Sequence, residues 1–155
     1  MKNLHLLLVD DEKRFLSTTR QLLENRGVTT HTAERGREAL RVINDTVIDV
    51  VLLDVKMPEM DGIATLRKIK QGHPLVEVIM LTGHASVDSA VDGMRLGAFD
   101  YLVKPCEIDE MLNKVKQAFM KKQATEEKIQ KVNVERIISH PLAVFDKDKD
   151  DQSGD

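Results

Sequence analysis

Leu4-His5-Leu6-Leu7-Leu8-Val9-Asp10-Asp11 stands near the start of the chain, an apolar run that ends abruptly in two acids. A nearly continuous apolar run of this length is typical of a strand that helices cover on both faces of a parallel sheet. It is too short, and too soon acidic, for a signal peptide or a membrane span. Three similar runs predict further buried strands, and a more polar, β-branched run predicts an edge strand. The buried runs cover 47–53, 76–81 and 98–103, and the edge run covers 28–32.

Between these runs, apolar residues recur at helical spacing. In the first such segment Phe15, Thr19, Leu22 and Leu23 share one face, and Gly27 follows as a C-terminal stop. Strand–helix alternation repeated five times predicts an α/β fold, a doubly wound five-stranded parallel sheet in the flavodoxin-like order 2-1-3-4-5 with helices on both faces. The other helical faces contain Ala39, Val42 and Ile43; Ile63, Leu66 and Ile69; Val87, Ala90, Val91 and Met94; and Ile108, Met111, Leu112, Val115, Ala118 and Phe119.

The pattern changes after this last segment, so we expect a domain at 1–121 and an extension at 122–155. The first part of the extension keeps a weak helical period through Ile129, Val132 and Ile137. His140-Pro141 then predicts a break in the helix. The last ten residues are rich in acids and lysines, a composition typical of disordered segments.

Composition narrows the class of function. The formal net charge of −3 gives no sign of direct nucleic-acid binding. The single cysteine, Cys106, cannot form an intramolecular disulfide, which favours a reducing cytoplasm.

Polar residues follow four of the predicted strands where each strand ends. Asp10 and Asp11 end the first strand, Asp54 the third, Thr82 the fourth and Lys104 the fifth. The carboxyl ends of parallel strands meet at one edge of the sheet, where open α/β sheets bind their ligands. An Asp at such a place is also a common helix N-cap, but five such residues together indicate one site.

The residue types of this site suit phosphoryl transfer. Carboxylates a few ångströms apart repel by roughly 4 kcal/mol per pair at an effective dielectric constant of ~20, so the three acids favour a bound cation. Oxygen ligands in an incomplete protein shell suit Mg²⁺. Lys104 and Thr82 offer donors to phosphate oxygens, and Gly83 leaves the backbone N–H open to close approach. Asp54 would be the carboxylate nucleophile.

At this point the chain resembles a known family, the receiver domains of two-component response regulators, over roughly residues 1–121. The likeness implies that Asp54 accepts a phosphoryl group from a phosphohistidine on a sensor histidine kinase or phosphotransfer protein. It rests on five motifs in the family's order and spacing. These are Leu8-Val9-Asp10-Asp11-Glu12, Leu53-Asp54, Met57-Pro58-Glu59-Met60-Asp61-Gly62, Leu81-Thr82-Gly83 and Lys104-Pro105.

The resemblance also implies how a metal would be held. Asp11 and Asp54 would bind Mg²⁺ directly, together with the main-chain carbonyl of Lys56. Asp10 would act mainly through a metal-bound water.

The resemblance further implies a conformational switch. Thr82 and Lys104 would hold the phosphoryl oxygens, and the rotamer of Tyr101 would follow the movement of Thr82. The Lys104–Pro105 peptide bond would be cis. The side chains of Lys56 and His84 lie where the family varies, and they are either modifiers of the dephosphorylation rate or plain exposed loop residues.

The expected output is protein–protein contact by a stand-alone receiver that catalyses only its own phosphorylation and autodephosphorylation. Partners would be the kinase or phosphotransfer protein and a downstream protein, with no direct nucleic-acid or membrane contact. A homodimer through the fourth helix, fifth strand and fifth helix, or through the extended last helix, is a further expectation.

Four other functions fit the sequence less well. A flavodoxin needs hydroxyl-rich phosphate loops after the first strand, where this chain has acids. An aspartate-nucleophile phosphatase carries its nucleophile on the first strand with an acid–base Asp two residues later, whereas Lys56 follows Asp54 here. A P-loop nucleotide switch lacks its glycine-rich motif. A DNA-binding regulator requires a longer protein than this chain.

Overall fold

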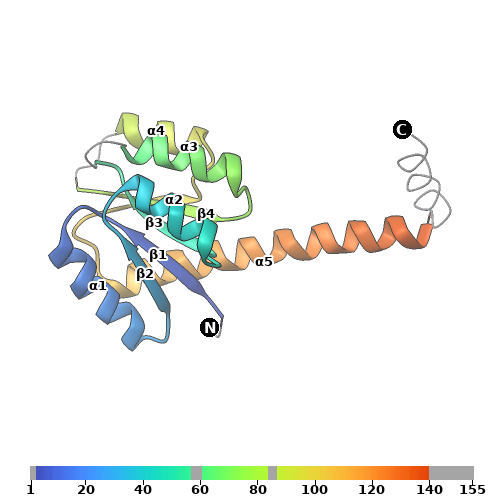
Figure 1. The fold of residues 1–155 in the computed structure, drawn as a ribbon, viewed down its shortest axis with the longest axis horizontal. Helices are drawn as coiled ribbons and strands as arrows, with labels where there is room; N and C mark the ends of the chain where they lie inside the picture. Colours follow the sequence, from blue (N-terminus) through green and yellow to red (C-terminus); the bar gives the residue numbers. More distant parts are fainter. Residues whose placement is uncertain (1–2, 57–60, 84–86, 140–155) are drawn as a thin grey trace. The chain divides into compact units, whose positions relative to one another are not determined.

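The computed structural model describes residues 3–56, 61–83 and 87–139, except the side chains of 87–89. The predicted sheet is confirmed, with five parallel strands in the order β2-β1-β3-β4-β5 (Figure 1). The more polar β2 lies at one edge, as its composition predicts, and the four-residue β5 lies at the other. The strands are β1 His5–Val9, β2 Thr29–Ala33, β3 Val50–Asp54, β4 Glu77–Thr82 and β5 Asp100–Val103.

Helices cover both faces of the sheet, which explains why β1, β3 and β4 are almost wholly apolar. One core cluster joins α1 and α5 to the face that carries Leu6 and Leu8. The other joins α2 and α3 to the face that carries Leu7 and Val9. The helices are α1 Lys13–Asn25, α2 Gly36–Asp45, α3 Gly62–Gly72, α4 Val87–Arg95 and α5 Ile108–Ser139.

Some predicted positions are wrong. The third strand begins at Val50 instead of Val47, and Val47 is 71% exposed. In α1, Leu22 is 45% exposed, because the buried stripe runs through Leu16, Thr19 and Leu23. A stripe spaced by three and four residues turns position 22 towards solvent.

The predicted buried face of α4 is also wrong. Val91 and Met94 were predicted to share a buried face, but both are exposed. Gly93 is buried between them, and a Cβ there would lie 3.2 Å from the Met80 side chain. The small residue is thus the one that meets the sheet.

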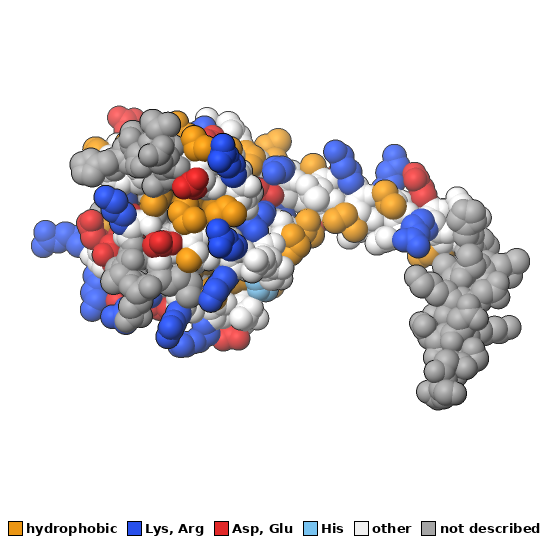
Figure 2. Space-filling model, turned by 90° about the horizontal axis from the view of Figure 1, so that it is seen from above, with side chains coloured by type: hydrophobic (Ala, Val, Ile, Leu, Met, Phe, Trp, Pro, Cys, Tyr) orange, Lys and Arg blue, Asp and Glu red, His pale blue; other side chains and the backbone are white. Residues whose placement is uncertain are grey.

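The chain divides into two compact units, Met1–Lys122 and Gln123–Asp155. In the second, the described residues continue the helix to Ser139 and are mostly exposed, including Ile129, Val132 and Ile137. Figure 2 shows hydrophobic and basic side chains along this helix. The predicted break at His140-Pro141 and the acidic tail lie outside the described residues. None of the helices in the described ranges combines the length and hydropathy needed to cross a bilayer.

Candidate functional site

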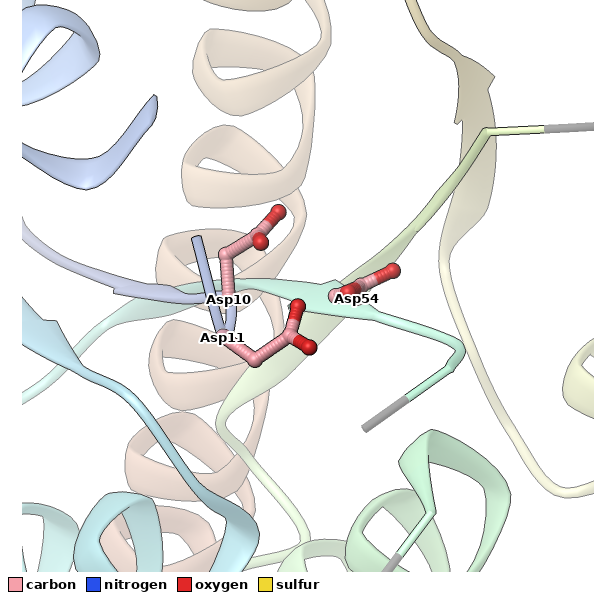
Figure 3. A group of neighbouring side chains, drawn as sticks. All are labelled: Asp10, Asp11 and Asp54. Atoms are coloured by element: carbon pink, nitrogen blue, oxygen red, sulfur yellow. The ribbon is translucent and has the colours of Figure 1, made fainter. Parts of the chain in front are cut away.

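Three carboxylates meet at the carboxyl edge of the sheet. Asp10 and Asp11 follow β1, and Asp54 is the last residue of β3, the neighbouring strand. One oxygen from each lies within 4.8 Å of the others (Figure 3). Asp10 is fully buried, Asp54 is 7% exposed, and Asp11 is exposed. The predicted convergence of these acids is therefore present, with one side open to solvent.

The backbone holds two of these carboxylates in place. The Glu12 N–H donates to Asp10 Oδ1 at 2.9 Å. The Lys56 N–H donates to Asp54 Oδ1 at 3.4 Å, a longer and weaker bond. Both donors lie two residues beyond their acceptor, the pattern of an Asx turn, so the loops themselves aim the carboxylates.

The start of α3 packs directly on the backbone of Asp54. A Cβ on Gly62 would lie 2.3 Å from the Asp54 carbonyl oxygen and 2.7 Å from Val55 Cα. The side chain of Asp61 caps α3 by accepting the Ala64 N–H at 2.8 Å. In the sequence, Asp61-Gly62 marks only the end of a motif, and the structure shows that this glycine is needed for the close approach.

Crowding changes the acidity of Asp54. Burial and then the Asp10 charge raise the pKa of the Asp54 carboxyl to about 6, and Asp11 adds to this. The Lys104 ammonium and the Lys56 N–H offset part of the rise. The cluster thus has surplus negative charge, and hard oxygen donors with one open side fit Mg²⁺.

Lys104 and Thr82 line the same edge. Lys104 follows β5, and its ammonium pairs with the Asp10 carboxylate. It also lies 4.3 Å from the centroid of the Phe15 ring, a contact that the sequence interpretation missed because it assigned Phe15 only to the core. Thr82 is buried at the end of β4, and its carbonyl accepts the Lys104 N–H at 2.7 Å. Gly83 is exposed, and among the described residues, its chain neighbours aside, no heavy atom lies within 4 Å of where a Cβ would stand.

The remaining predicted site residues include Tyr101 and Lys56. Tyr101 is 43% exposed on β5 and lines, with α4, a surface hollow of about 450 Å³. Lys56, two residues after Asp54, is exposed, and metal binding by its main-chain carbonyl stays a prediction. His84 and the stretch 57–60 of the quoted motif lie outside the described residues. The Lys104–Pro105 bond is cis, as expected.

Comparison with known proteins identifies the family to which this chain belongs. The response regulator receiver domain matches residues 6–116, and the chain belongs to this family. It is 41% identical over 109 residues to the transcriptional regulatory protein ZraR of Escherichia coli K12, covering 70% of this chain and 25% of ZraR. It is 42% identical over 111 residues to the DNA-binding transcriptional regulator NtrC of the same organism, covering 72% of this chain and 24% of NtrC.

Solved structures agree with the fold. A CheY-like response regulator receiver domain protein from Methanospirillum hungatei JF-1 superposes with a TM-score of 0.75 at 31% identity, covering 79% of this chain and 98% of the other. The chain spans about a quarter of the length of the curated relatives above, but nearly all of this receiver structure.

Proposed function

We propose that this receiver accepts a phosphoryl group on Asp54 in a Mg²⁺-dependent step of a phosphorelay. The observation that carries the proposal is the cluster itself, in which Asp10, Asp11 and Asp54 converge within 4.8 Å. An Asp54 oxygen would attack the phosphorus of a phosphohistidine, forming the P–O bond as the P–N bond breaks and the imidazole leaves. With a pKa of about 6, Asp54 is mostly ionised at neutral pH and more basic than an ordinary Asp.

The cation would offset the repulsion between the attacking carboxylate and the incoming phosphoryl group. Asp11 and Asp54 would hold it together with the Lys56 main-chain carbonyl, and Asp10 would hold it through water. The exposure of Asp11 beside two buried acids supports this division, because the open side leaves room for water and a phosphate oxygen.

The phosphorylated carboxylate would be held by two donors. Lys104 is already in the pocket beside Asp10, and Thr82 ends the strand next to β3. The exposed Gly83 would let its N–H approach the phosphoryl oxygens. The donors would be drawn in because phosphorylation replaces one charge by nearly two and adds acceptor oxygens.

The response would be a change of the surface formed by α4, β5 and α5. Movement of Thr82 would let Tyr101 repack into the hollow lined by Ala90, Val91 and Met94. Lys56 and His84 would tune the lifetime of the phosphorylated form. The chain would act on no free substrate, and its chemistry would be limited to its own phosphorylation and dephosphorylation.

A sensor histidine kinase or phosphotransfer protein would supply the phosphoryl group, in the cytoplasm, and a downstream partner would recognise the changed surface. A second copy, meeting the α4–β5–α5 surface or the extended α5, is the other partner we propose. The two curated relatives are named as transcriptional regulators and are much longer than the matched segment. That length favours, for the whole protein, an output module joined to the receiver over the stand-alone receiver expected above.

The test is incubation with Mg²⁺ and acetyl phosphate, a small acyl-phosphate donor, followed by intact mass. We expect one added phosphoryl group on the wild type, and no addition on Asp54→Asn or without Mg²⁺. Asp109→Asn is the matched control, because Asp109 is an exposed acid that pairs with Arg26, the residue just after α1, and it should phosphorylate like the wild type. An equal adduct on Asp54→Asn, or no adduct on the wild type, would disprove the proposal.

A further inference from the structure

The Phe15 ring stands at the edge of the site, on the first turn of α1. We propose that Phe15 is a positioning residue for phosphoryl transfer, which holds the Lys104 ammonium in the pocket through its ring face. The inference rests on the proposed function of Asp54 and adds a residue and a physical interaction to it.

The geometry places the ammonium between an anion and an aromatic face. Lys104 Nζ pairs with Asp10 and lies 4.3 Å from the Phe15 ring centroid. This separation is well inside the range of about 6 Å at which a ring quadrupole attracts a cation. The Lys104 side chain is only 18% exposed, so water screens the attraction little. Phe15 itself is half-buried against the core shared by α1 and α5.

The ring can attract the ammonium in a way that does not depend on the metal. Asp10 would interact with Mg²⁺ as well as with Lys104, so the ion pair between Asp10 and Lys104 would weaken when the metal binds. Phe15 attracts the ammonium without being a ligand for the metal. The Lys104 side chain would therefore stay in the pocket when Asp10 interacts with the metal. Without the ring it would move into solvent, and its conformational entropy would have to be lost again at the moment of phosphoryl transfer.

A second phenylalanine–lysine pair provides a comparison within the same protein. Lys121 Nζ lies 5.7 Å from the Phe99 ring centroid, and the Lys121 side chain is 55% exposed. Phe99 packs against the same core cluster as Phe15. Phe99, however, directly precedes β5, and Lys121 pairs with Glu77 at the start of β4. This pair therefore lies at the amino ends of the strands, away from the carboxyl ends that form the site. Loss of Phe99 should therefore cost stability without affecting the phosphoryl site.

The experiment measures the rate of phosphorylation by acetyl phosphate in Mg²⁺. Phe15→Leu keeps apolar bulk but removes the ring, and we expect it to slow the reaction roughly three- to tenfold. Phe15→Tyr keeps the ring face and should react within about twofold of the wild type. Phe99→Leu is the matched control and should keep the wild-type rate.

Fluorinated phenylalanines at position 15 separate electrostatics from packing. Each added ring fluorine withdraws charge from the ring face with little change in shape, so the rate should fall stepwise along the series while the melting temperature stays constant. Independently, NMR of the Lys104 side-chain methylenes should show an upfield ring-current shift that Phe15→Leu removes.

The outcomes separate the two proposals. A wild type that takes no phosphoryl group overturns the proposed function, and this positioning role with it. A wild type that is phosphorylated, with a flat rate along the fluorine series or a Phe15→Leu rate equal to the wild type, overturns the role of Phe15 alone. Should Phe15→Leu fail to fold, the tyrosine and fluorinated variants still decide the question.

Discussion

The ammonium of Lys104 pairs with the carboxylate of Asp10, although β3 and β4 lie between β1 and β5, the strands that these two residues follow. The lysine thus reaches across the carboxyl ends of two strands and joins residues 94 positions apart in the chain. Because Asp10 is fully buried, this pair removes much of the cost of an isolated buried charge. The charge of Asp54, beside Asp10 and Asp11, is poorly compensated, and the pKa of its carboxyl is raised to about 6.

Asp54 should therefore destabilise the fold at neutral pH. Its folded pKa of about 6 lies above its ordinary value of 3.8, so stability should fall as pH rises from about 4 to about 6 without Mg²⁺. Asp54→Asn should flatten that slope and, after allowance for solvent screening, gain about 1 kcal/mol at pH 7, or roughly 4 °C in melting temperature. Urea unfolding at several pH values measures this. A variant with the same slope as the wild type would contradict it.

Mg²⁺ should stabilise the wild type through the acidic cluster. At a concentration ten times its Kd, the gain in unfolding free energy is about 1.4 kcal/mol. Asp11→Asn should reduce this gain, because it removes a proposed direct ligand, and Asp10→Asn should weaken it as well. Thermal melts across a Mg²⁺ titration give the answer, with Asp109→Asn expected to respond as the wild type does. Equal Mg²⁺ shifts in all four proteins would mean that the ion binds elsewhere.

Gly62 and Gly72 form a matched pair at the two ends of α3. Gly62→Ala would force a methyl group to 2.3 Å from the Asp54 carbonyl oxygen, so it should cost about 2 kcal/mol or more and slow phosphorylation. A methyl group at Gly72 would meet no atom of the described residues within 4 Å beyond its chain neighbours and its own helix backbone, so Gly72→Ala should gain about 0.5 kcal/mol and keep the wild-type rate. Denaturation and acetyl phosphate kinetics of the two variants test the contrast. Similar costs for both would show that α3 does not press on the site.

Two adjacent lysines of α5 hold buried acids at the amino ends of the strands, far from the phosphoryl site. Lys122 pairs with Asp49 at 2.9 Å with both side chains largely buried, and Asp49 also accepts the His5 N–H at 2.8 Å. Lys122→Met should cost about 3 kcal/mol, because Asp49 keeps a buried charge with its ammonium partner gone. Lys121→Met should cost less than about 1 kcal/mol, since Lys121 is 55% exposed and lies 3.5 Å from Glu77.

Equilibrium unfolding of the two lysine variants measures this difference. The double variant Asp49→Asn with Lys122→Met should recover part of the loss, because it removes both buried charges. No recovery would show that Lys122 acts by packing alone.

Much of this protein follows from local sequence. The apolar runs are long and continuous enough to predict β1, β3 and β4, because a strand covered on both faces tolerates few polar side chains. The acids that end β1 and β3 could be placed in one site for a topological reason: parallel strands bring their carboxyl ends to the same edge. The approach of Asp10, Asp11 and Asp54 to within 4.8 Å is thus a consequence of strand order.

Other features were decided only by packing between distant segments. The rotation of α1 exposes Leu22, and that of α4 exposes Val91 and Met94, because the buried stripe of a helix depends on how it lies on the sheet. The choice of Asp10 and Phe15 as the partners of Lys104 likewise depends on where β5 ends relative to β1 and α1. The sequence by itself determined which residues reach the carboxyl edge. Only the tertiary structure decided which side chains they contact there, because those contacts join segments that are far apart in the chain.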